Sequence, residues 1–206
     1  LNLFVRDMPR LSVDIDLTYL PIQSYPDSIA AIDAAMRRIE TRIKAGIPGS
    51  TTSGGGKEAR THLLVRAEGV TSEIEVTPVM RGCVYDAELK TVTDTVENTF
   101  GFAEMQVLSF ADLYGGKFVA ALDRQHPRDF FDTRQLLDNE GIDDSLRRSF
   151  LVYLISGSRP MHEVLTARRK DMTADFKRGF DGMTEEPVTL EELNAARETF
   201  IAEAVG

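Results

Sequence analysis

The sequence has little cysteine and no tryptophan: Cys83 is the one cysteine among 206 residues. A single cysteine excludes an intramolecular disulfide framework and is typical of a protein from a reducing compartment. No apolar run reaches the roughly 20 residues that a membrane-spanning helix needs, and no secretory signal pattern opens the chain. We therefore expect a cytoplasmic protein with no membrane association.

Positive charge is also scarce. Lysine and arginine total 24 against 33 aspartate and glutamate residues, which gives a formal net charge of -9. This balance excludes a broadly basic coat for nucleic acid, although it is compatible with a local basic region. With 42% hydrophobic residues, the chain has the composition of a globular protein of one or two domains.

The first half of the chain mixes strand and helix patterns. Alternating or β-rich segments predict strands over 11–20, 61–67, 72–80 and, more weakly, 85–93. A helical period runs from Pro26 to Gly46, whereas the segment 49–56 consists of Gly, Ser and Thr only and predicts a loop.

The second half is helical in pattern. The predicted helices cover 109–124, 127–141, 145–155, 161–172 and 190–204. Ser109 and Asp112 have the spacing of a capping box, with Asp in place of Glu. The predicted fold class is α+β, with an α/β domain over 1–100 and a helical domain over 101–206.

Acidic residues on two predicted strands could hold a metal ion. Asp14 and Asp16 stand at i and i+2 of a strand, so both carboxylates project from one face. Such a pair is either a site for a hard cation or a solvated surface pair. Glu75 on a later strand could complete a set of three oxygen ligands for one or two Mg²⁺ ions. Glu73 shares its face and could take this role, and an exposed acidic edge is the alternative for both.

Charged residues near the junction of two predicted helices form the next candidate group. Lys117 stands among small and apolar residues, where a lysine can serve as a point charge for a phosphate. Arg124 and Arg128 add positive charge at the junction. Asp129 falls in the first turn of the second helix, where it is favourable for the helix dipole.

Other polar residues are interpreted without a functional role. His126 and Asp132 are expected to be loop or surface groups. The run 54–57 fails as a phosphate-binding loop because Thr51 and Glu58 stand where the motif needs glycine and a hydroxyl residue.

Two of these segments together resemble the AbiEii-type nucleotidyltransferase toxins of bacterial abortive-infection toxin–antitoxin pairs. The resemblance is carried by Arg-x-Ser-x-Asp-x-Asp-Leu over 10–17 and by Lys-x-x-Ala-Ala-Leu-x-Arg-x-x-x-Arg-Asp over 117–129, with a strand-borne acid between them. It implies a DNA polymerase β-like nucleotidyltransferase palm, a mixed sheet with helices, followed by a C-terminal helical domain.

The resemblance also implies roles for individual residues. It implies Asp14, Asp16 and Glu75 as catalytic metal ligands for Mg²⁺, with two ions expected. Lys117 matches the motif lysine that contacts the nucleotide phosphates, and Asp129 matches the acidic residue of the last motif. The residues expected to bind the NTP are Ser12, Lys117, Arg124 and Arg128.

The implied activity is transfer of a nucleoside monophosphate from an NTP to an acceptor hydroxyl. By family likeness the acceptor is RNA, such as the 3′ end of a tRNA, and an antitoxin protein is a further partner. The basic residues that could offset the net acidity toward RNA are Arg124, Arg128, Arg147, Arg148, Arg168, Arg169 and Lys170.

The start of the chain leaves two other functions open. The family has a Gly-Gly-Ser or Gly-Gly-Thr turn just before the segment that begins here at Leu1, so we expect an N-terminally truncated core. A truncated chain could be a catalytically impaired remnant that serves as a protein-binding module. The other alternative is a small-molecule nucleotidyltransferase of the antibiotic-modifying kind.

Overall fold

The computed structural model describes residues 1–10 and 14–205. The chain divides into two compact units: a sheet unit, Val13–Gly82, and a helical unit, Leu1–Ser12 with Cys83–Gly206. The sheet unit therefore interrupts the helical unit in the sequence. The sequence-based division into domains 1–100 and 101–206 was drawn where the helical patterns begin. It stays a prediction.

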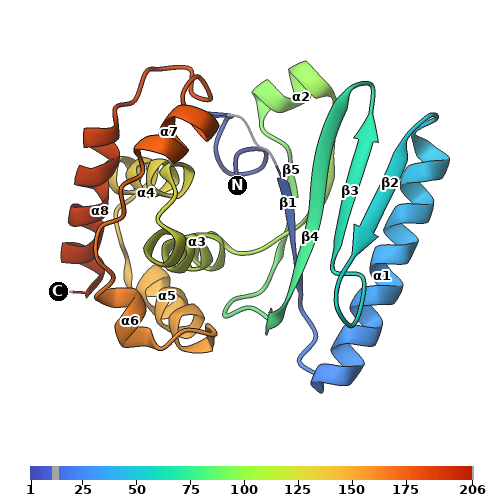
Figure 1. Cartoon of the computed structure of the whole chain (residues 1–206), viewed down its shortest axis with the longest axis horizontal. Coiled ribbons are helices and arrows are strands. Elements are labelled where there is room, and N and C mark those ends of the chain that lie inside the picture. Colours follow the sequence, from blue (N-terminus) through green and yellow to red (C-terminus); the bar gives the residue numbers. More distant parts are fainter. Residues whose placement is uncertain (11–13, 206) are drawn as a thin grey trace. The chain divides into compact units, whose positions relative to one another are not determined.

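The sheet unit contains a four-stranded mixed sheet and one long helix (Figure 1). The elements are β1 (Asp14–Tyr19), α1 (Tyr25–Gly46), β2 (Thr51–Gly55), β3 (His62–Ala67) and β4 (Val70–Arg81). The strand order is β1-β4-β3-β2, with β1 parallel to β4 and the other pairs antiparallel. The predicted strands over 61–67 and 72–80 are thus confirmed as a hairpin, while residues 11–13 of the first predicted strand lie outside the described residues.

The helix α1 covers one face of this sheet. Ser24 caps its N-terminus by accepting a hydrogen bond from the Asp27 amide, and Pro26 lies in its first turn, where the missing amide hydrogen costs little. The residues that form the buried contact between helix and sheet are Ile32, Met36, Leu63, Ile74 and Val76. Because side chains alternate along a strand, the residues between these apolar ones lie on the opposite face.

The glycine-rich segment 49–56 is not the predicted loop. Thr51–Gly55 forms β2, which pairs with β3 along its whole length at the edge of the sheet. The prediction is wrong because strand pairing uses backbone groups, which small residues carry as well as large ones. The neighbouring β3–β4 turn agrees with its sequence: Glu68 and Gly69 both have positive φ, 51° and 80°, as a two-residue hairpin turn requires.

In the residues that the structure describes, the helical unit has a small hairpin, with a short helix between its two strands, followed by six helices. Its elements are β5 (Glu88–Thr91), α2 (Asp94–Phe100), β6 (Glu104–Val107), α3 (Phe110–Arg124), α4 (Pro127–Asn139), α5 (Asp144–Ser156), α6 (Met161–Leu165), α7 (Thr173–Gly179) and α8 (Leu190–Val205). The predicted helix over 161–172 is wrong in length, since α6 ends at Leu165. The elements α2, β6 and α7 were not predicted.

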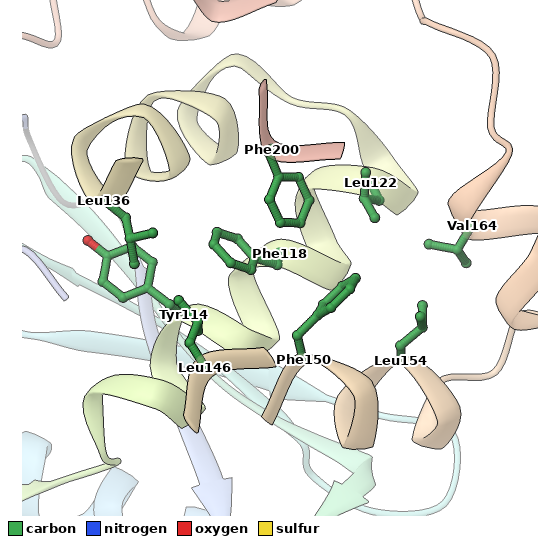
Figure 2. Packing of buried hydrophobic residues seen from close by; sticks show 9 residues of the cluster. All are labelled: Tyr114, Phe118, Leu122, Leu136, Leu146, Phe150, Leu154, Val164 and Phe200. Atoms are coloured by element: carbon green, nitrogen blue, oxygen red, sulfur yellow. The ribbon is translucent and has the colours of Figure 1, made fainter. Parts of the chain in front are cut away.

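An aromatic cluster forms the core of the helical unit (Figure 2). Phe118 of α3 has its ring centroid 4.1 Å from that of Phe200 of α8 and 6.0 Å from that of Phe150 of α5. The helices α3 and α5 approach closely at Gly115, where an added Cβ would lie 2.9 Å from Cβ of Ser149. Glycine at this position therefore allows the two helix backbones to pack together.

The buried Asp112 of α3 binds the backbone at the start of the segment Cys83–Gly206. Its carboxylate, 1% exposed, accepts hydrogen bonds from the amides of Val84 and Tyr85 at 2.7 and 3.0 Å. The hydroxyls of Ser109 and Tyr153 donate to the same carboxylate at 2.6 and 3.0 Å. The Asp112 amide donates to Ser109 Oγ at 3.0 Å, so the predicted cap of α3 is confirmed.

Candidate active site

Four carboxylates gather on the face of the sheet opposite α1. In the parallel pairing of β1 with β4, Asp14 is the register partner of Glu73, and Asp16 is the partner of Glu75. Paired strands lie about 4.8 Å apart and paired residues project from the same face. We call these four residues the acidic face, and both of the glutamates weighed from the sequence belong to it.

The acidic face is open to solvent in the sheet unit. Asp14, Asp16 and Glu75 are exposed and Glu73 is partly buried. His62 of β3 is the register partner of Glu75 on its other side, which adds an imidazole to the same face. Among residues 1–10 and 14–205, no three His, Cys, Asp or Glu side chains are grouped as a metal ion needs.

The register and the donor chemistry nevertheless fit a hard divalent cation. Mg²⁺ takes oxygen ligands and is commonly held by one or two carboxylates together with substrate phosphates. The acidic face offers several carboxylates within side-chain reach of one another and requires no change in backbone pairing.

A second group of charges surrounds Asp132 in the helical unit. Asp132 of α4 is 2% exposed, and its two oxygens accept hydrogen bonds from Nε and Nη2 of Arg10, both at 2.8 Å. Nζ of Lys117 on α3 lies 3.1 Å from Oδ2 of the same carboxylate. The prediction that Asp132 is a loop or surface group is therefore wrong, because two cations compensate its burial.

The charge state of Asp132 follows from these contacts. Burial by itself would raise the pKa of this carboxyl, but the charges of Lys117 and Arg10 and their hydrogen bonds hold the pKa below its usual value. One carboxylate thus faces two cations, and Lys117 is the more accessible of them, with a side chain 24% exposed against 8% for Arg10. The arrangement leaves an ammonium group that can attract an anion such as a phosphate.

The pair of Arg124 and Asp129 forms at the junction of α3 and α4. Nε and Nη2 of Arg124 donate to the two oxygens of Asp129 at 2.6 and 2.7 Å. Asp129 is 1% exposed in the first turn of α4, which agrees with the structural explanation from the helix dipole. The guanidinium remains 61% exposed, so its outer edge is accessible.

The residues beside this pair have distinct positions. His126 lies outside the helices, as predicted, and is also the N-cap of α4, where its Nδ1 accepts a hydrogen bond from the Arg128 amide at 3.2 Å. Arg128 lies in the first turn of α4 and is partly buried. Ser12, predicted to bind nucleotide, lies outside the described residues.

The predicted site residues thus fall into two groups, one in each unit. The sheet unit carries the acidic face, and the helical unit carries Lys117, Arg124, Arg128 and Asp129. The residues that sequence reasoning missed are Arg10 and Asp132. The signal for Asp132 was a second acid three residues after Asp129, on the same face of an amphipathic helix. In the described part of the chain, no helix has the length and apolar composition of a membrane span.

Comparison with known proteins identifies the class of fold first. The chain is similar in structure to MenT4, a nucleotidyltransferase toxin from Mycobacterium tuberculosis H37Rv, with a TM-score of 0.66. The two share 18% sequence identity, and the match covers 99% of this chain and 72% of that one. The α+β fold is therefore that of a nucleotidyltransferase toxin. A search of curated protein sequences gives no significant match.

The family of the chain follows from its sequence. Residues 1–204 match the family described as nucleotidyl transferase AbiEii toxin, type IV TA system. The chain belongs to this family. It is accordingly a nucleotidyltransferase enzyme and the toxin of a toxin–antitoxin system, with an NTP as substrate and an antitoxin as partner, and the resemblance seen in its sequence is confirmed.

Proposed function

We propose that the chain transfers a nucleoside monophosphate from an NTP to a hydroxyl of RNA, with Mg²⁺ held at the acidic face. The observation that carries the proposal is the register of Asp16 with Glu75, because it joins carboxylates 59 positions apart in the sequence on neighbouring strands. In this reaction the acceptor oxygen bonds to the α-phosphorus while the bond to the bridging oxygen breaks. Pyrophosphate then leaves.

The proposed metal ligands are Asp14, Asp16 and Glu75, with Glu73 as the alternative to Glu75. Magnesium bound by these carboxylates would neutralise phosphate charge and lower the pKa of the acceptor hydroxyl. Without a cation, four carboxylates on one sheet face repel one another, which favours cation binding at this face over a purely structural role. The same carboxylates are candidates to take the proton of the acceptor hydroxyl.

The proposed role of Lys117 is to contact the nucleotide phosphates. Its support is the contact with Asp132, which restricts the position of the ammonium group without covering it. Asp132 and Arg10 are then positioning residues that act through Lys117. Arg124 at the end of α3 and Arg128 in the first turn of α4 are proposed to bind the nucleotide as well, with Asp129 holding the Arg124 guanidinium.

Transfer of labelled nucleotide tests this function directly. The chain is incubated with each α-labelled NTP, Mg²⁺ and total tRNA, and the RNA is separated on a gel. We expect label on RNA, and we expect Asp16→Ala to reduce it by at least 100-fold, because a ligand of the metal is lost. Glu104→Gln, an exposed acid on β6, is the control and should retain transfer.

The acceptor is tested in the same assay. Aminoglycosides replace tRNA in a parallel series, since a small-molecule acceptor is the competing assignment. Label on the aminoglycoside and none on RNA would reject RNA as the acceptor. Undiminished transfer by Asp16→Ala would reject the assignment of the metal ligands.

A further inference from the structure

A short irregular segment between α6 and α7 carries three consecutive cations, Arg168, Arg169 and Lys170, which we call the basic run. All three residues are exposed. Arg168 and Arg169 have no carboxylate within ion-pair distance in the part of the chain that the structure describes. Nζ of Lys170 lies 2.8 Å from Oδ2 of Asp175 on α7. On a chain with a net charge of -9, such a run is a local exception.

The backbone of this run is fixed by two buried side chains from other helices. Gln125, at the C-terminus of α3, is 5% exposed. Its amide nitrogen donates to the Arg168 carbonyl and its amide oxygen accepts from the Lys170 amide, both at 2.9 Å. Arg197 of α8, 6% exposed, donates to the Ala167 carbonyl at 2.8 Å.

These anchors have a consequence for the charges. Residues 167–170 have no helix or strand to hold them, yet their backbone is bonded at three points to buried groups. The cationic side chains are thereby presented outward from a fixed backbone, so a ligand does not bear the cost of ordering the segment.

The basic run also lies beside the charges at the start of α4. Gln125 directly precedes the His126 cap and follows Arg124, whose guanidinium is 61% exposed. Burial, and then the charges of Arg128 and Arg124, lower the pKa of His126, whereas the charge of Asp175, the partner of Lys170, acts in the opposite direction. Three carboxylates lie near the run: Asp171 directly follows it and accepts hydrogen bonds from Thr173, Asp175 faces Lys170, and Asp129 is buried beneath Arg124.

We propose that the basic run is a docking surface for the phosphate backbone of the RNA acceptor. The inference rests on the proposed function and adds a binding surface to it. Exposed cations on an anchored backbone fit a polyanion, and phosphodiester contacts of this kind supply affinity without requiring a particular base sequence. A local basic surface also explains how a chain of negative net charge binds RNA.

Binding of RNA measured apart from catalysis tests the proposal. The full chain and the variant Arg168→Gln/Arg169→Gln/Lys170→Gln are titrated against fluorescent tRNA without NTP, between 50 and 200 mM salt. We expect at least tenfold weaker binding by the variant at the lowest salt. We also expect the slope of log K against log salt to become shallower by about two to three, since three phosphate contacts are lost.

Two further variants separate docking from general charge. Arg147→Gln/Arg148→Gln removes two exposed arginines from α5 and is compared with Arg168→Gln/Arg169→Gln. Arg147 and Arg148 were also candidates from the sequence, but docking by the basic run predicts that their loss changes affinity by less than twofold. Gln125→Ala releases the backbone of the run and keeps its charges, so it should weaken binding several-fold. Circular dichroism verifies that each variant is folded.

Failure of the docking surface and failure of the proposed function give different results in these experiments. If the parent labels tRNA while the triple variant binds like the parent, or if the α5 pair loses as much affinity, the docking surface is overturned. If the parent binds tRNA through the run but transfers no nucleotide, the proposed function fails and the docking surface stands. If the triple variant loses only antitoxin binding, the run is a protein contact and the assignment to RNA is overturned.

Discussion

Lys117 and Arg10 share the buried carboxylate of Asp132: Nζ of the lysine lies 3.1 Å from Oδ2, and Nη2 of the arginine donates to the same oxygen at 2.8 Å. The contact links α3, α4 and the segment that precedes the sheet unit in the sequence. A single carboxylate therefore influences both the stability of the helical unit and the position of a candidate catalytic cation.

Asp132→Asn should lower stability far more than the loss of a surface charge does, because its carboxylate is buried. The substitution leaves Arg10 buried without its counter-charge, and we expect the free energy of unfolding to fall by about 3–5 kcal/mol, measured by urea denaturation. Asp138→Asn, at an exposed i,i+4 pair with Arg134, should change stability by less than about 0.5 kcal/mol. Lys117→Met should retain most of the stability and lose nucleotide transfer. Equal stability of Asp132→Asn and the parent would contradict the buried ion pair.

The acidic face should respond to charge removal in a manner that needs no activity assay. Asp16→Asn relieves repulsion with Glu75, and without divalent ions we expect it to stabilise the protein by about 0.2–1 kcal/mol. Added Mg²⁺ should raise the melting temperature of the parent and raise that of the variant much less. Glu104→Gln is the control and should keep the full response to Mg²⁺. A response as large in Asp16→Asn as in the parent would remove Asp16 from the metal ligands.

The cap of α4 should make stability depend on pH. Burial, followed by the charge of Arg128, lowers the pKa of His126 below its usual 6.5, and the neutral ring accepts the Arg128 amide. The unfolded chain then binds a proton more readily than the folded one, so the contribution of His126 is complete above pH 6.5 and is lost as the pH falls toward the folded pKa. We expect a lower urea midpoint at pH 5.5 than at pH 7.5.

His126→Asn is the test of this assignment. Asparagine is a good N-cap and does not titrate, so the variant should show a smaller loss between the two pH values. His162→Asn, at an exposed position on α6, should keep the loss of the parent. A parent and His126→Asn with the same pH dependence would show that the cap histidine does not cause it.

The close packing of α3 against α5 predicts opposite effects at two neighbouring glycines. Gly115→Ala would bring a methyl group within 2.9 Å of Cβ of Ser149, and we expect destabilisation by about 1–3 kcal/mol. At Gly116 the nearest atom is a Tyr153 ring carbon at 4.0 Å, so Gly116→Ala should stabilise the helix by up to about 1 kcal/mol. Ser149→Gly should restore part of the stability of Gly115→Ala. Equal effects at both glycines would contradict the packing.

Local patterns predicted the elements whose causes are local. The alternation around Ile74 and Val76 and the two-residue turn at Glu68 and Gly69 specify a hairpin by themselves. Ser109 specifies the start of α3 because a cap acts within one turn. The edge strand Thr51–Gly55 was missed because it depends on a partner strand rather than on its own composition.

The candidate site likewise has features that depend on local spacing and features that depend on tertiary contacts. Asp14 and Asp16 were found from their spacing, and Glu75 and Glu73 from the polar side of a strand, but their register with each other is a tertiary property. The spacing of Asp132 from Asp129 places both acids on one helix face, but the ion pair that allows Asp132 to be buried was missed because its partner Arg10 is 122 positions away in the sequence. The anchoring of residues 168–170 by Gln125 was missed for the same reason, since 43 to 45 positions separate these groups.

The insertion of residues 13–82 into the helical unit also has a consequence for synthesis. The sheet unit is one continuous stretch of chain, so all the residues of its sheet are present once Gly82 has left the ribosome. The helical unit cannot complete its core until α8 delivers Phe200, 118 positions after Gly82. Until α4 has been made, Arg10 has no Asp132 to bind, so it depends on a partner 122 positions later in the sequence.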